Sequence, residues 1–98
     1  MLNKELSELI YTNINEWIIA YYRVWTCRII VECNIEFKDE KAIRKMLESE
    51  TNTMLRKISK FKNILTSDDY TRAKSLVKSL HDDTYRVIIK SLYKEGVM

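Results

Sequence analysis

The chain contains a single glycine and no proline among its 98 residues. Tight turns depend on these two residues, because glycine adopts positive φ angles freely and proline fixes φ near the value that turns need. The shortage therefore argues against a turn-dense all-β fold and favours long helices with few connections. It also argues against phosphate-cradling loops, dinucleotide-binding turns and nucleophile elbows, each of which needs glycines at defined positions.

Three segments show the repeat of apolar residues every three or four positions that is typical of amphipathic helices. The first begins near Leu2, and the second begins after Asp39, whose side chain can cap it, and runs to about Leu65. The third begins at a capping box over residues 66–69 and is expected to end near Gly96.

Two polar stretches are candidate breaks in these helices. Residues 48–53 are expected to bend the second segment, because Ser, Thr and Asn side chains compete for backbone hydrogen bonds. Residues 81–84 either interrupt the third segment or face water. Short connections between long helices favour antiparallel neighbours. We therefore expect one all-α domain over residues 1–98, a small antiparallel bundle of three to four helices.

Residues 25–37 admit a second interpretation, because apolar residues there also alternate with mostly polar ones, as in a strand. The sequence offers no second run of this kind to pair with it. A lone strand leaves its backbone groups unpaired unless another chain supplies the partner. We favour a helix through about Cys33 and leave open a short strand that pairs across a dimer.

Aromatic side chains are concentrated in the first segment, where Trp17, Tyr21, Tyr22 and Trp25 lie close together. From Trp17 to about residue 31 the helix is apolar on all faces, which indicates that partners surround it. Aromatic residues are also frequent at interface hot spots. We expect these four residues and Ile29 to contact another protein chain, either a second copy or a larger assembly. The alternative is that they fill the core of a small bundle.

Positive charge is concentrated in the middle of the chain. The net charge is +3, whereas residues 41–62 hold seven basic and two acidic side chains. Arg56, Lys57 and Lys60 are expected to share a helix surface, with Lys62 nearby, and the four cations could bind phosphates without reading sequence. The alternative is a solvated helix face.

Only His81, Asp82 and Asp83 bring a histidine and carboxylates together, and adjacent residues on a helix diverge. We interpret them as a cap at a helix junction with a solvated imidazole. The sequence contains no Ser/His/Asp or Cys/His arrangement. We expect no catalytic residue, no metal site, no cofactor and no small-molecule substrate.

Cys27 and Cys33 fit neither a disulfide framework nor a usual zinc spacing. We expect both thiols to be reduced and buried, as in an intracellular protein, cytoplasmic or nuclear. The polar first residues predict no signal peptide. The longest apolar run, residues 17–31, is short and contains two arginines, so no membrane span is expected.

The sequence Leu55-Arg-Lys-Ile58 is followed by Leu65-Thr-Ser-Asp-Asp-Tyr70 and then by Leu76, Leu80 and Tyr85. With this pattern residues 47–93 resemble the helical domain of the GINS subunits, which scaffold the replicative helicase in archaea and eukaryotes. The resemblance covers about half of the chain, and the small β domain of those subunits has no counterpart in this sequence. It implies a non-catalytic subunit that contacts sister subunits through its helices, with no catalytic residues to transfer.

These features predict a helical protein that acts by binding protein, as a homodimer or as a small subunit of a larger assembly, including one that processes nucleic acid. The alternative is a nucleic-acid-contacting module that uses the basic residues 55–62. Abundant Ile, Lys, Asn and Tyr are typical of AT-rich genomes, including those of viruses.

Overall fold

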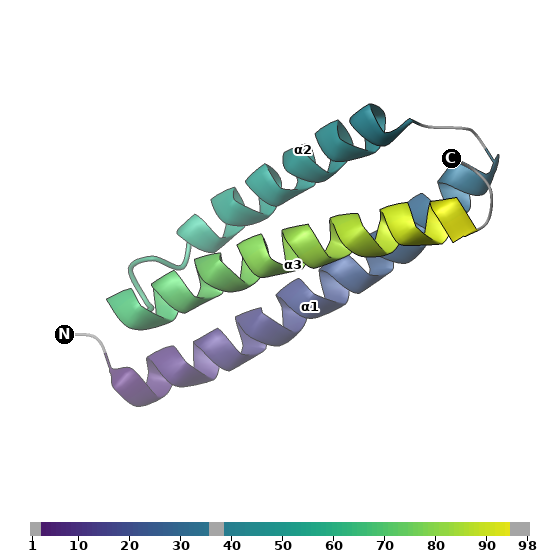
Figure 1. Cartoon of the computed structure of the whole chain (residues 1–98). Helices are drawn as coiled ribbons and strands as arrows, with labels where there is room; N and C mark the ends of the chain where they lie inside the picture. The colour runs from purple at the N-terminus through teal and green to yellow at the C-terminus, as the bar shows by residue number, and fades with distance from the viewer. Residues whose placement is uncertain (1–2, 36–38, 95–98) are drawn as a thin grey trace.

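The structure, a computed structural model, describes residues 3–35 and 39–94. It contains α1 (Lys4–Ile35), α2 (Glu40–Ser59) and α3 (Ser67–Lys94), and no strand lies in the described residues (Figure 1). The molecule is elongated, with dimensions of 54 × 18 × 16 Å. The all-helical prediction is confirmed for these residues. The expected stop at Gly96 lies outside them.

The first helix continues through the stretch that also had a strand pattern. Trp25, Ile29 and Cys33 are buried on one side of α1, whereas Cys27 and Val31 between them are exposed. That spacing of four residues is helical, because a strand would place all five side chains on the same face. The helical interpretation therefore holds to Ile35, and the remainder of residues 25–37 lies outside the described part of the chain.

The second helix begins as the sequence predicts and ends earlier. The Asp39 carboxylate accepts a hydrogen bond from the Ala42 backbone N–H at 2.8 Å, which caps α2. Residues 48–53, where a bend was expected, lie within the single helix Glu40–Ser59, and Thr51 is buried there. After Ser59 the backbone tightens into turns, yet Leu65 at their end is still buried in the core.

The third helix is uninterrupted from Ser67 to Lys94. Of the two outcomes left open for residues 81–84, an interruption does not occur, since α3 runs through them. Asp82 and Asp83 face solvent, whereas His81 is partly buried and Thr84 is buried. The four side chains thus satisfy a helical pattern in which two point inward and two point outward.

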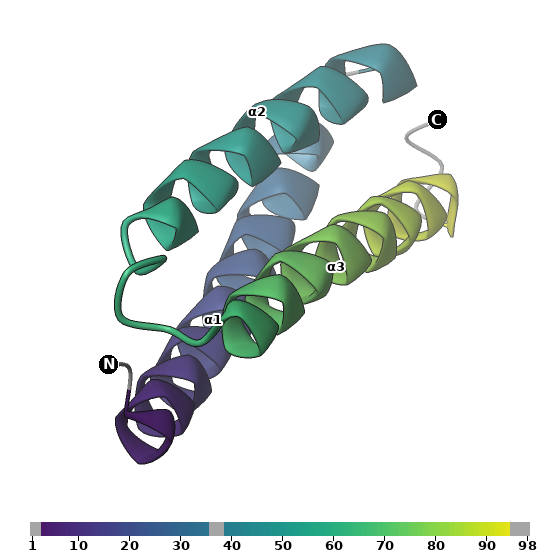
Figure 2. The same ribbon diagram turned by 90° about the vertical axis from the view of Figure 1, so that its left-hand side faces the viewer.

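The helices pack around one apolar core, and α3 lies beside both α1 and α2 (Figures 1 and 2). The backbones of α1 and α2 approach each other less closely. The core draws on all three helices and on the connection before α3. Among the residues whose burial the structure describes, its buried apolar members are Ile14, Ile18, Tyr22, Trp25, Ile29, Cys33, Ile43, Leu47, Met54, Ile58, Leu65, Ala73, Val77, Ile88 and Leu92.

Candidate interaction surfaces

The structure divides the aromatic segment that the sequence predicted to form one contact. Tyr22, Trp25 and Ile29 are 2%, 5% and 0% exposed and belong to the core of this chain. Trp17 is 39% exposed and Tyr21 is partly buried. The interpretation of five residues as one outward surface needs this correction, since three of them are covered by α2 and α3.

Trp17, at the edge of the exposed side of α1, and Tyr21 both lie near Lys57 of α2. The Lys57 ammonium lies 6.0 Å from the Trp17 ring centroid and 5.8 Å from that of Tyr21, within the range of cation–π attraction. The Tyr21 hydroxyl donates a hydrogen bond to Glu50 of α2. This hydrogen bond, with burial, raises the pKa of Tyr21 to about 12. Long side chains therefore bridge the helix pair whose backbones are farther apart.

A chain of hydrogen bonds joins all three helices at mid-height. The Tyr22 hydroxyl of α1 lies 2.8 Å from the Thr51 hydroxyl of α2, which lies 2.7 Å from Nδ1 of His81 on α3. Burial raises the pKa of Tyr22. His81 is thus held between helices, which corrects its interpretation as a solvated imidazole at a helix junction.

The carboxylates beside His81 do not converge with it. Asp83 is paired with Arg86 on the exposed side of α3, and Asp82 is also exposed. In residues 3–35 and 39–94 no group of three or more His, Cys, Asp and Glu side chains could hold a metal ion. The arrangement around His81 therefore connects helices and presents no set of ligands.

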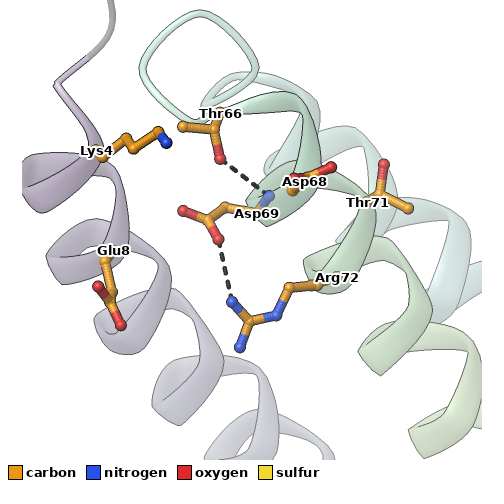
Figure 3. Close-up of a pocket in the computed structure, with 7 residues that line it drawn as sticks. All are labelled: Lys4, Glu8, Thr66, Asp68, Asp69, Thr71 and Arg72. Atoms are coloured by element: carbon orange, nitrogen blue, oxygen red, sulfur yellow. Dashed lines mark hydrogen bonds and ion pairs between the residues drawn. The ribbon is translucent and has the colours of Figure 1, made fainter.

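A polar junction joins the first turns of α1 and α3 (Figure 3). The Ser7 hydroxyl donates to the Asp69 carboxylate at 2.7 Å and accepts the Thr66 backbone N–H at 2.8 Å. The Thr66 hydroxyl accepts the Asp69 N–H at 3.1 Å, as expected of an N-cap. Arg72 pairs with Asp69 at 3.2 Å and lies 4.2 Å from the Tyr11 ring centroid. The capping box was predictable, but the contribution of Ser7 from another helix was not.

The pocket at this junction measures about 640 Å³ and is lined by Lys4, Glu8, Thr66, Asp68, Asp69, Thr71 and Arg72. The carboxylate of Asp69, which is buried, already accepts hydrogen bonds from Ser7 and Arg72, and the Asp69 backbone N–H donates to Thr66. The hydrogen bond from Ser7 is the largest influence that lowers the pKa of Asp69. These contacts fix the start of α3, and they use the Asp69 carboxylate to hold α1 and α3 together.

The four cations of the predicted basic surface lie in two kinds of secondary structure. Arg56 and Lys57 are in the last turn of α2, whereas Lys60 and Lys62 follow in the turns after Ser59. All four are exposed, but Lys57 leans over the aromatic rings of α1. The expectation of one continuous basic helix is therefore corrected, because α2 ends before the last two cations.

Large apolar side chains of α1 also project to solvent on the side away from the core. Of these, Val24 is the most exposed at 69%, and the set comprises Leu6, Leu9, Trp17, Val24 and Val31. At about 100° per residue these positions fall within about 80° of arc, together with Asn13, Ala20 and Cys27. We call these eight residues the outer face of α1. The exposure of Cys27 corrects the prediction that both thiols are buried.

An open apolar groove lies beside the outer face, between α1 and α3. Its volume is about 530 Å³, and Ile19, Cys27, Leu76, Leu80 and Val87 provide most of its apolar lining. Arg23 and Asp83 also line it. Cys27 belongs to both features, so the groove adjoins the outer face at this residue.

No protein family model matches the chain, and neither a curated protein nor a solved structure gives a match. Among the described residues, no helix is both long enough and apolar enough to cross a membrane.

Proposed function

We propose that the protein is a non-catalytic helical bundle that acts by binding another protein chain through the outer face of α1. The observation that carries this proposal is a row of exposed apolar side chains along a helix of 32 residues. Soluble monomers seldom leave large contiguous apolar patches exposed, and such patches mark interaction sites. A partner helix packed along this row would remove it from water.

The packing of the chain supports this assignment. Among the described residues, fifteen apolar side chains already form a closed core, so the outer face is not needed to complete it. Ser7 of α1 meets Asp69 of α3, and Tyr22 meets Thr51 of α2, contacts that fit a bundle whose successive helices run antiparallel. An intracellular subunit of a larger assembly, the role that the GINS resemblance implies, would use the outer face in the same way. That resemblance covers residues 47–93 and so does not include this face.

We propose a non-catalytic role because the polar side chains that could act as acids or bases already bond to other residues of this chain. His81 is bonded to Thr51, Asp69 to Ser7 and Arg72, and Asp83 to Arg86. Each of these contacts links or caps helices. A helical scaffold needs such contacts, whereas a general base needs a reacting group within hydrogen-bond reach.

The test is the native mass of the protein in an extract of the cells that produce it. Val24→Asp adds a charge in the middle of the outer face, and Ile64→Asp adds the same charge at an exposed site in the turns before α3. We expect the wild type and Ile64→Asp to migrate in a complex and Val24→Asp to migrate as a monomer. A wild type of monomer mass, or a complex that Val24→Asp leaves unchanged, would contradict the proposal.

A second candidate function is contact with nucleic acid through Arg56, Lys57, Lys60 and Lys62, favoured by the exposure of all four cations. Such contact would weaken as salt is added. For each phosphate contacted, the logarithm of the association constant should fall by about 0.9 for every tenfold rise in salt concentration. Reversing Arg56, Lys60 and Lys62 to Glu should abolish binding to duplex DNA or RNA. An unchanged affinity would dismiss this function.

A further inference from the structure

The outer face of α1 has the residue pattern of a coiled-coil seam. In a heptad frame seven of its residues form the seam, with Trp17, Val24 and Val31 at a positions and Leu6, Asn13, Ala20 and Cys27 at d positions. Leu9 falls at a g position beside the seam, and the remaining a position, Ile10, is partly buried against the core of this chain. Two helices with such a seam can pack along it in either direction. The residues beside the seam then decide which direction is favourable.

We infer that a second copy of this chain covers the outer face, with the two α1 helices antiparallel. This inference rests on the proposed function, in that it takes the same surface and names its partner. Its central observation is the charge pattern at the edges of the seam. Glu16 and Arg23 lie at g positions, Arg28 lies at an e position, and all three are exposed.

A parallel pair is disfavoured by these charges. In parallel helices each g residue faces the e residue that follows it in the partner helix. Arg23 would therefore face Arg28 of the second copy, and symmetry would create this like-charge pair twice. Like charges at these positions select against a pairing.

An antiparallel pair turns the same residues into attractive contacts. There each g residue faces a g residue of the partner, so Glu16 meets Arg23 of the second copy, again twice by symmetry. Arg28 then lies opposite the position of Ser7, whose side chain is buried in the junction with α3, so that no like charge faces Arg28 there. Charge complementarity therefore favours the antiparallel direction.

The shapes along the seam fit the same register. Trp17 of one copy lies opposite Ala20 of the other, so that a large side chain meets a small one at both central layers. Asn13 lies opposite Val24 of the second copy. The Asn13 amide already donates to the Leu9 carbonyl at 2.9 Å, which limits the cost of covering this polar side chain.

The test is the dimer dissociation constant of the purified full chain, measured by sedimentation equilibrium at low salt. We expect wild type to dimerise and Val24→Asp to remain monomeric. Arg23→Glu places a carboxylate opposite Glu16, so the dissociation constant should rise about tenfold for two reversed pairs. Glu16→Arg should act in the same direction, and the double exchange Glu16→Arg with Arg23→Glu should restore wild-type affinity within about twofold.

Lys78→Glu is the matched control, because it makes the same charge change at an exposed site on α3 outside both the seam and the groove. Lys78→Glu should leave the dimer dissociation constant unchanged, and circular dichroism should show the same helix content in every variant. A stronger dimer with Arg23→Glu would overturn the antiparallel direction, since that result requires Arg23 to face Arg28.

A wild type that stays monomeric at millimolar concentration would overturn the second copy as the occupant. The proposed function is tested separately by the native mass in a cell extract. It is contradicted if no complex is found there or if Val24→Asp leaves the complex intact. A monomeric purified chain with a native complex sensitive to Val24→Asp would mean that the outer face binds a different protein.

Discussion

The Thr51 hydroxyl lies 2.7 Å from Nδ1 of His81 and is the link through which α1, α2 and α3 share one hydrogen-bonded layer. Tyr22 bonds to the same oxygen from the α1 side, so Thr51 serves two buried or partly buried partners at once. The layer fixes the position of each helix along the others, because a shift of any helix breaks one of the two bonds. Polar layers of this kind specify one arrangement among several that an apolar core would tolerate.

Thr51→Val should destabilise the protein by about 2 kcal/mol, because it leaves the Tyr22 hydroxyl and His81 Nδ1 without their partner. Valine keeps the shape of the side chain, so lost packing contributes little. Thr51→Ser keeps the hydroxyl and should cost less. Urea unfolding followed by circular dichroism measures both, and equal stability of Thr51→Val and wild type would show that the layer adds nothing.

Ser7→Ala should lower the unfolding free energy by about 1–2 kcal/mol, because it removes the acceptor of the Thr66 N–H and a donor to Asp69. Thr12→Ala in the same helix, whose hydroxyl bonds back to the Glu8 carbonyl and which lies outside the outer face, is the control and should change little. Thermal unfolding at neutral pH distinguishes the two variants. The prediction is wrong if they lose the same stability.

The wild type should lose stability in acid through Asp69. The fold lowers the pKa of this carboxyl from the ordinary 3.8, so its contribution is present above that pH and is lost as the pH falls through the folded value. Asp69→Asn should flatten this part of the curve of unfolding free energy against pH. A variant curve parallel to that of the wild type below pH 4 would contradict the assignment.

At alkaline pH the effect of Tyr21 has the opposite sense. Its pKa rises from 10.0 to about 12 in the fold. The contribution of Tyr21 to the free energy of unfolding is therefore complete below pH 10, and it declines above that pH because the Tyr21 hydroxyl ionises first in the unfolded chain. Stability should fall between pH 10 and 12, and Tyr21→Phe should reduce that fall. Phenolate absorbance of the two proteins across this range checks the assignment directly.

The two cysteines should differ in reactivity. Cys27 is exposed and Cys33 is 1% exposed, so a thiol reagent should modify Cys27 rapidly in the native protein and Cys33 only after unfolding. Cys27→Ser should therefore remove the fast phase. Two equally slow phases in dilute native protein would contradict the exposure of Cys27.

Local signals in the sequence were sufficient for the elements and for some of their ends. Asp39 caps α2 and Thr66 caps α3 because short polar side chains at helix starts act on their own neighbours. The end of α2 was not predictable in this way, since Phe61 and Leu65 continue the helical spacing. Leu65 reaches the core from a turn instead of a helix.

The candidate site depended on long-range packing. The part of α1 from Trp17 to about residue 31 offers two apolar faces to the core, and sequence alone does not say which one α2 and α3 will cover. The structure covers Tyr22, Trp25 and Ile29 and leaves Val24 and Val31 exposed. Ser7 and His81 likewise find partners on other helices, where no local motif could announce them.

We propose that the outer face of α1 is a protein contact and that a second copy binds there. Light scattering of the purified wild type and of Val24→Asp over a range of concentrations would measure this association. The wild type should rise from the monomer mass of 11.8 kDa towards twice that value, while Val24→Asp stays at 11.8 kDa. Equal masses for the two proteins at every concentration would contradict the claim.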